Sequence, residues 1–336
     1  MFNHLKAAFV LLFLTALPFN AAFARCTLGD TVLLSPAEEQ LAVEQAVGIA
    51  NHSGRLYAIE TNAGRSLLFG TMHSVDPTLT IPQQISDAIS TAQALLIEIT
   101  SEDQADMQAE MARDPSLFMN LDGPGLREQL SQKDWERLAT ALRPFGIPPE
   151  AADQLQPWFA STLIAIPFCE LQLQAGGQLT LDQQIEDLAE TRSIPVRALE
   201  SPQDVFAAMS GMSAEDEVLF LQSALATQSL AEPLFADILN LYTQGRIAEI
   251  ETRSDLIAQR EAPEAALDTA FDAFEQALLV DRNANWLPTI LENLDAGPTV
   301  IAVGALHLTG GAGLVALLRQ EGYTVERIVL EGETRP

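Results

Sequence analysis

Two histidines of this chain follow glycines in matched surroundings. Gly70 to His73 and Gly304 to His307 both read Gly-x-x-His, and both close an apolar run typical of a buried strand. Ligands of open α/β sheets bind at the carboxyl ends of strands, where a glycine lets the backbone turn sharply. Two neutral imidazoles at one such edge can hold Zn²⁺ or another transition metal, with carboxylates completing the ligands. We therefore predict that His73 and His307 bind a metal; the alternative for either alone is a structural histidine.

Two glutamates lie where they would complete such a site. Glu98 interrupts the apolar run 95–100, and a buried carboxylate is costly unless it is paired or bound to a metal. The alternative is a position on a solvated face of that strand. Glu200 closes the strand-like segment 195–200, directly before Ser201-Pro202, so it serves either the site or the start of the next helix.

An Arg-Asn pair adds groups that recognise oxygen atoms. Arg282 and Asn283 lie in a long helical segment beside Trp286. Arginine binds carboxylates and oxyanions, and asparagine can orient a water or a substrate carbonyl. For Asp182, in contrast, we expect only that it stabilises a helix N-terminus through the helix dipole.

Strand-like segments cluster at the two ends of the chain. Segments 56–61 and 66–71 are separated by turn residues and predict a hairpin, and a helix is expected after Pro82. Ser101 to Gln104 resembles a capping box that opens another helix. Near the C-terminus, the order strand, helix, strand predicts a parallel sheet covered by helices.

The middle of the chain is mostly helical. Apolar residues recur every three to four positions in several segments between about 127 and 230. We predict an α/β fold of mixed α+β character, with a central sheet, flanking helices and a helical insertion at roughly 101–295 that the strand near 195–200 interrupts.

The first 24 residues resemble a secretory signal peptide. A short start with Lys6 leads into an apolar run, and Ala22 and Ala24 occupy the positions that signal peptidase reads. Cleavage is expected after Ala24, which leaves one domain over 25–336, periplasmic or secreted, without a membrane anchor. Lipidation at Cys26 is the weaker alternative, because Arg25 stands where a small residue is needed.

The chain is acidic, and its cysteines are few. The formal net charge of −28 argues against binding nucleic acid or an anionic membrane surface, since both require positive charge. Cys26 and Cys169 are the only two cysteines. In an oxidising compartment such a pair more often forms a disulfide than a catalytic thiol, so we predict a Cys26–Cys169 disulfide.

These motifs together resemble the TraB/GumN family, which includes the animal Tiki proteases. The resemblance is closest to the exported bacterial GumN-like branch, including its two cysteines. The segments that carry it are LLFGTMHSVDP (67–77), LLIEIT (95–100), LQPW (155–158), LDQQI (181–185), VRALES (196–201), RNANW (282–286) and VGALHLTGGAGLVALLRQEGYTVER (303–327).

The resemblance implies a fold like that of erythromycin esterases and ChaN-type haem-binding proteins. Tiki relatives are proteases that depend on Mn²⁺ or Co²⁺ and carry two GxxH motifs, which correspond here to Gly70–His73 and Gly304–His307. The family's acidic position corresponds to Glu98, and its Arg-Asn pair to Arg282 and Asn283. Tiki proteins are membrane anchored, whereas release after cleavage is expected here, so their substrate does not transfer.

The resulting expectation is a periplasmic metal-dependent hydrolase, most simply a peptidase, with Mn²⁺, Co²⁺ or Zn²⁺. Its peptide or small-molecule substrate and its oligomeric state are open. Glu98 is either a third ligand or the general base, Arg282 and Asn283 stabilise an oxyanion, and Glu200 supports the site. The alternatives are a protein that binds haem or a small ligand without turnover, and a non-catalytic partner in the envelope or in exopolysaccharide export.

Overall fold

The computed structural model describes residues 33–262 and 272–334. The signal peptide and Cys26 lie outside these ranges, so the cleavage site and the disulfide stay predictions.

A six-stranded sheet forms the centre of the fold, in the order β4-β3-β5-β2-β1-β6. The strands are β1 Leu56–Thr61, β2 Gly64–Thr71, β3 Ala94–Ile97, β4 Val196–Ala198, β5 Thr299–Gly304 and β6 Thr324–Ile328. The predicted hairpin is confirmed: β1 and β2 pair antiparallel, and Gly64 adopts a φ of 130° at the turn, a value that favours glycine.

The sheet is mixed, whereas the C-terminal strand–helix–strand order predicts a parallel one. β5 pairs parallel with β2 and β3, and β3 pairs parallel with β4. β1 runs antiparallel to both of its neighbours, β2 and β6. The tight hairpin reverses the chain between β1 and β2. The four parallel neighbours therefore end at one common edge.

Helices make up most of the remaining chain. The α-helices are α1 Pro36–Gly48, α2 Gln83–Ile89, α3 Ser101–Arg113, α4 Leu126–Gln129, α5 Gln132–Ala141, α6 Pro149–Ala152, α7 Pro157–Ala165, α8 Phe168–Ala175, α9 Leu181–Thr191, α10 Pro202–Met209, α11 Ala214–Thr227, α12 Ala231–Thr243, α13 Ile247–Glu261, α15 Asp281–Ala296 and α16 Leu314–Gln320. Short turns of other pitch include the π-helical η4 Gln276–Val280 and the 3₁₀ turn η5 Ala305–Leu308.

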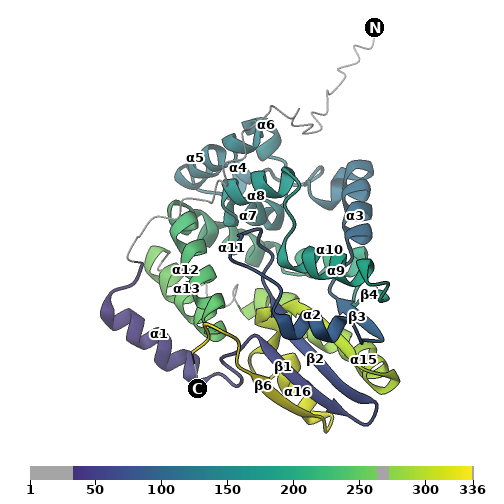
Figure 1. The fold of residues 1–336 in the computed structure, drawn as a ribbon. Coiled ribbons are helices and arrows are strands. Elements are labelled where there is room, and N and C mark those ends of the chain that lie inside the picture. The colour runs from purple at the N-terminus through teal and green to yellow at the C-terminus, as the bar shows by residue number, and fades with distance from the viewer. Residues whose placement is uncertain (1–32, 263–271, 335–336) are drawn as a thin grey trace.

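Two apolar layers cover the two faces of the sheet. One face packs against α2, α9, α12 and α13, in a core that includes Phe69, Ile85 and Ile185. The other face packs against α15 and α16, in a core that includes Leu68, Trp286 and Leu318. Helices α4 to α7 and α11 share a separate core and lie above the sheet in Figure 1.

Two boundaries differ from the sequence prediction. Strand β3 ends at Ile97, so Glu98 follows the strand instead of lying inside it. Glu98 is also buried, with 8% of its surface exposed, which excludes the solvated face. The capping box begins one residue earlier than expected: Thr100 exchanges hydrogen bonds with Asp103, whereas the hydroxyl of Ser101 donates to Glu186. Glu186 satisfies Ser101 from another helix, which local sequence does not reveal.

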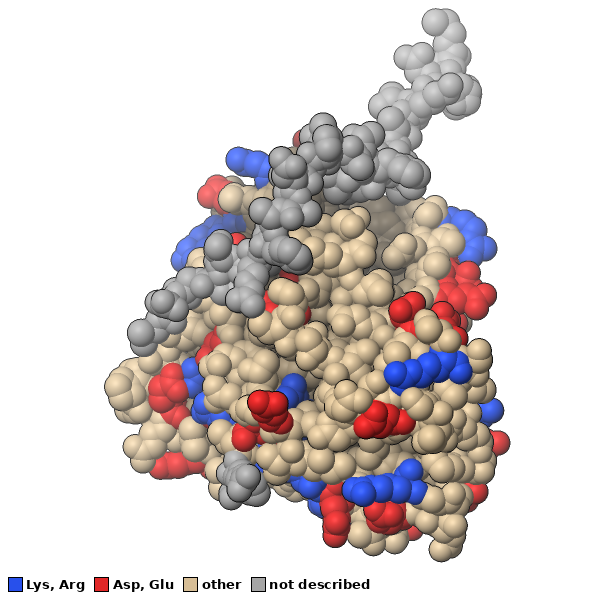
Figure 2. All heavy atoms as spheres, viewed as in Figure 1, with Lys and Arg blue, Asp and Glu red and all other residues tan. Residues whose placement is uncertain are grey.

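Charged residues are dispersed over the surface. On the face shown in Figure 2, Asp and Glu side chains are scattered among uncharged areas, with Lys and Arg between them. In the described ranges, no helix has both the length and the apolar character needed to cross a bilayer.

Glu217 of α11 makes the stability of this fold depend on pH. It is buried, accepts a hydrogen bond from the backbone N–H of Trp158, and burial raises its pKa to about 7. A carboxyl whose pKa is higher in the folded than in the unfolded chain destabilises the fold once the pH exceeds the pKa of the unfolded chain, because the unfolded chain then releases the proton more readily. We expect Glu217→Gln to increase the free energy of unfolding at about pH 8 by roughly 1–2 kcal/mol, after allowance for screening by water, and by less at about pH 5. Urea unfolding at both pH values measures this, and an equal effect at both would contradict it.

Candidate active site at the carboxyl ends of four strands

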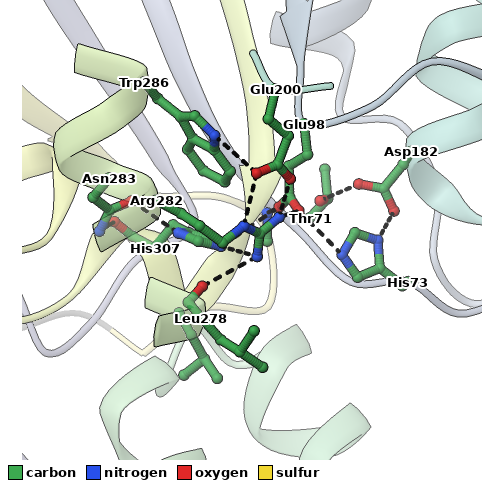
Figure 3. A network of polar contacts seen from close by, with 12 residues as sticks. Thr71, His73, Glu98, Asp182, Glu200, Leu278, Arg282, Asn283, Trp286 and His307 are labelled. Carbon is green, nitrogen blue, oxygen red and sulfur yellow. Dashed lines mark hydrogen bonds and ion pairs between the residues drawn. The ribbon is translucent and has the colours of Figure 1, made fainter. Parts of the chain in front are cut away.

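Each of the four parallel strands delivers one polar side chain to the same edge of the sheet. His73 follows β2, Glu98 follows β3, Glu200 follows β4 and His307 follows β5 by one to three residues. Helix α15 adds Arg282, Asn283 and Trp286 from the side (Figure 3). The structure therefore brings together all six residues that the sequence nominates.

An aspartate holds the His73 ring in place. Nδ1 of His73 lies 2.8 Å from Oδ2 of Asp182, and the hydroxyl of Thr71 donates to Oδ1 of the same carboxylate. The His73 side chain is 61% exposed, so the negative charge of Asp182 outweighs desolvation and raises the pKa of His73 above its usual value. With Nδ1–H directed at Asp182, Nε2 faces Glu98, 3.9 Å from Oε2.

The His307 ring is held by an amide. Asn283 Nδ2 donates to the carbonyl oxygens of His307 and Ala312, which fixes the orientation of this amide. Its oxygen therefore faces Nδ1 of His307 at 2.8 Å, and Nδ1 carries the proton. Burial lowers the pKa of His307 to about 4, so the ring is neutral near pH 7, and its unprotonated Nε2 faces Nη1 of Arg282 and Oε1 of Glu98.

Glu98 lies between the two imidazoles. Its Oε1 accepts the backbone N–H of Gly304 at 2.6 Å and lies 3.8 Å from Nε2 of His307. Its Oε2 accepts from Nη2 of Arg282 at 2.8 Å. Burial alone would raise the pKa of Glu98, but His307, His73, Arg282 and the Gly304 N–H together lower it to about 2. The carboxylate is therefore charged over the whole neutral range.

Arg282 links Glu98 to Glu200. Its Nε and Nη2 donate to the two carboxylate oxygens of Glu200, and Nη1 donates to the carbonyl of Leu278 at 3.1 Å. Nη1 also lies 3.3 Å from Nε2 of His307, and the guanidinium stacks over Trp286, 4.7 Å from the ring centroid. Burial raises the pKa of Glu200, although Arg282 partly opposes this. The indole N–H of Trp286 donates to Glu200 as well.

The two motif glycines make room in different ways. A Cβ at Gly70 would lie 2.8 Å from Cα of Ala305, so Gly70 allows the turn after β5 to pack against β2. A Cβ at Gly304 would lie 3.3 Å from Oε1 of Glu98, 3.6 Å from Cδ2 of His307 and 3.7 Å from Nε2 of His73. Gly304 thus leaves open the space that the candidate residues surround.

Helix α9 holds the ends of two strands from one of its faces. Asp182 binds the end of β2 through Thr71 and His73. Glu186, one turn later, accepts the N–H and the hydroxyl of Ser101, just beyond β3. Residues four apart lie on the same side of a helix, so one face of α9 binds both the segment of His73 and the start of α3, three residues after Glu98.

The family model described as TraB/PrgY/gumN family matches residues 56–327. The chain belongs to this family. The resemblance drawn from the motifs is thereby confirmed, and the matched region contains every residue of the cluster. No curated protein and no solved structure matches the chain.

In this family member, the donor types fit a divalent cation. Both imidazoles have Nδ1 bound to an oxygen acceptor and Nε2 directed at Glu98, an arrangement common around metal ligands. Within residues 33–262 and 272–334, however, no group of three or more His, Cys, Asp or Glu side chains is arranged to hold a metal ion. The Nε2 atoms of His307 and His73 lie 3.8 and 3.9 Å from the Glu98 oxygens, whereas metal bonds of about 2.1 Å bring neighbouring donors to roughly 3–3.5 Å.

Asp182 is the member of the cluster whose role the sequence does not predict. It does lie in the first turn of α9, where its charge suits the helix dipole. Because the helix dipole already accounts for an acidic residue at this position, the sequence gives no indication that Asp182 contacts His73, 109 residues away. The only signal was the position of the LDQQI motif among the segments that resemble the family.

Proposed function

We propose that this TraB/PrgY/gumN family member is a metal-dependent hydrolase, most simply a peptidase, with its centre at the carboxyl ends of β2, β3 and β5. One observation carries the proposal: the Nε2 atoms of His73 and His307 face one carboxylate, in front of a glycine that leaves space there. The His73 ring, whose pKa Asp182 raises, would give up its Nε2 proton on binding a cation. His73, His307 and Glu98 would hold a divalent cation such as Mn²⁺, Co²⁺ or Zn²⁺. Such a cation supplies Lewis acidity and lowers the pKa of a water bound to it.

The protein's own groups have separate roles in this proposal. Asp182 and Asn283 bind Nδ1 of the two rings and so orient both Nε2 atoms toward Glu98. Glu98 acts as a third donor, since its position between the two rings and its low pKa suit a ligand better than a base. A modest movement of its carboxylate toward the rings is part of the proposal.

Arg282 would act on negative charge at a substrate oxygen through its own positive charge, since its N–H groups already bind Glu98, Glu200, Leu278 and His307. Its guanidinium borders the cluster beside His307, and Glu200 and Trp286 fix its plane. A fixed cation at the point where charge develops stabilises the transition state more than the ground state. Asn283 has its amide fully engaged with His307 and Ala312, so in this proposal it positions His307 and does not contact the substrate.

Metal analysis of the purified protein tests the proposal. We expect about one equivalent of Mn²⁺, Co²⁺ or Zn²⁺, abolished in the His73→Ala/His307→Ala double variant because two of the three donors are gone. His52→Ala, a histidine outside the cluster, is the matched control and should keep the metal. Unchanged stoichiometry in the double variant would refute the site.

A peptide-library cleavage screen with added Mn²⁺ or Co²⁺ then tests for hydrolysis. Cleavage that the double variant lacks supports a peptidase. Metal binding without cleavage of any peptide would refute the peptidase and favour a binding role. A haem absorption band on reconstitution would favour the haem-binding alternative. Export to the periplasm is proposed on residues 1–24 alone.

A further inference from the structure

A buried carboxylate outside the cluster holds the segment that carries His73. Glu170 of α8 has 2% of its surface exposed, and its Oε1 accepts the backbone N–H of Val75 at 2.6 Å. Val75 lies two residues after His73, in the connection between β2 and α2. The contact joins residues 95 apart in the chain, so an insertion helix reaches the site segment directly.

Other contacts fix the same short segment from the same side. The backbone N–H of Leu181 donates to the carbonyl of Ser74, and the N–H of Ser74 donates to the carbonyl of Met72. Ser74 is fully buried. With Asp182 on the His73 ring, the main chain around His73 is therefore held by α8 and by the start of α9.

Glu170 is the side chain that holds the far end of this segment. The Val75 N–H would otherwise be a buried donor, since Val75 itself is 5% exposed. A buried donor without an acceptor is costly, so the segment would rearrange until another acceptor or water reached it. Such a rearrangement, two residues from His73, would shift the ring and disturb its bond to Asp182.

We propose that Glu170 is a positioning residue for His73. It contacts neither the candidate ligands nor the reacting atoms, and it acts through the Val75 N–H. The proposal deepens the proposed function and rests on it only where metal affinity is concerned. This role requires an acceptor oxygen at hydrogen-bond distance from the Val75 N–H, and it does not require a negative charge.

Two conservative variants separate the effect of side-chain length at position 170 from the effect of its negative charge. Glu170→Gln keeps an acceptor oxygen at the same distance and removes the charge. Glu170→Asp keeps the charge, but it is one methylene shorter and withdraws the oxygen from Val75. Gln172→Ala, at an exposed position of the same helix, is the control. If the Asp variant does not fold, Glu170→Met replaces it, because Met keeps the length without an acceptor oxygen.

The primary readout is the His73 ring, observed by NMR of the full, metal-free protein with isotope-labelled histidine. The Nδ1–H signal reports the bond to Asp182. We expect Glu170→Gln and Gln172→Ala to keep the wild-type signal, and Glu170→Asp to shift or broaden it while the His307 signal stays. A wild-type His73 signal in the Asp variant, or equal changes in the Asp and Gln variants, would overturn the proposal.

Titration with Co²⁺ provides the second readout. We expect Glu170→Asp to bind Co²⁺ about 10- to 100-fold more weakly than the wild type, as changes behind a metal ligand commonly do. Glu170→Gln should restore the affinity. If wild-type protein binds no divalent cation, the proposed function fails, whereas the His73 signal still decides the role of Glu170.

Discussion

Gly304→Ala is expected to abolish the function of the site while the fold stays intact. The added methyl group would occupy the space bounded by Glu98, His307 and His73, at 3.3 to 3.7 Å from their atoms. The backbone of Gly304 has a φ of −51° and a ψ of 138°, which alanine adopts without strain. We expect Co²⁺ affinity and any hydrolytic rate to fall by about 100-fold, since the methyl group would take up the space in which the proposed cation lies.

A glycine in the loop between η5 and α16 provides the control. A Cβ at Gly311 would have no atom within 4 Å, and Gly311 has no positive φ, so Gly311→Ala should leave metal binding and stability unchanged. Gly70→Ala should instead destabilise the fold, because its Cβ would meet the backbone of Ala305. Calorimetric titration and thermal unfolding of the three variants measure both effects. Full Co²⁺ affinity in Gly304→Ala would place the cation elsewhere.

Arg282→Met is expected to cause the largest loss of stability among single changes at the site. Glu98 and Glu200 are buried, and Arg282 is bonded to both. Methionine fills much of the volume but leaves the two carboxylates without this cation. Removing one partner of a buried ion pair costs about 3–5 kcal/mol, because the remaining charge stays desolvated.

A second change tests this explanation. Glu200→Gln removes one of the two stranded charges, so the double variant Arg282→Met/Glu200→Gln should regain part of the lost stability. Arg137→Met removes an exposed arginine that pairs with Asp134 and should cost less than about 1 kcal/mol. Denaturant unfolding compares the wild type with these three variants. A loss below about 1 kcal/mol in Arg282→Met, or no recovery in the double variant, would contradict the explanation.

Local patterns were sufficient to predict the strands that matter most. The hairpin of β1 and β2 follows from alternating apolar runs and a glycine turn, and β5 follows from a continuous apolar run ended by Gly304. Because parallel strands end at one edge, placing histidines after those runs also predicts that His73 and His307 meet. Glu98 was expected inside its strand, and only the end of β3 at Ile97 brings it to the same edge. The sequence signals of both histidines are local.

Contacts that depend on distant elements were not predictable in the same way. Asp182 and Glu170 reach the His73 segment from helices about a hundred residues away, and each has an ordinary local interpretation within its own helix. The shift of the helix cap from Ser101 to Thr100 has the same origin, because Glu186 takes the Ser101 hydroxyl. One sequence shows which residues are available, but tertiary packing decides which partner each of them binds.

The π turn η4 has a consequence for insertions and deletions. Upstream of it, Phe274 stacks on Phe220 of α11, with ring centroids 4.4 Å apart. Downstream, Trp286 and Ile290 of α15 are anchored in the core against the sheet. One extra residue per turn rotates everything beyond it by about 100° relative to a regular α-helix. Loss of a single residue from η4 would therefore rotate α15 relative to the segment of Phe274. Either Phe274 would then lose its contact with Phe220, or Arg282 at the start of α15 would turn away from Glu98. The length of this five-residue turn therefore sets the direction in which Arg282 faces the site.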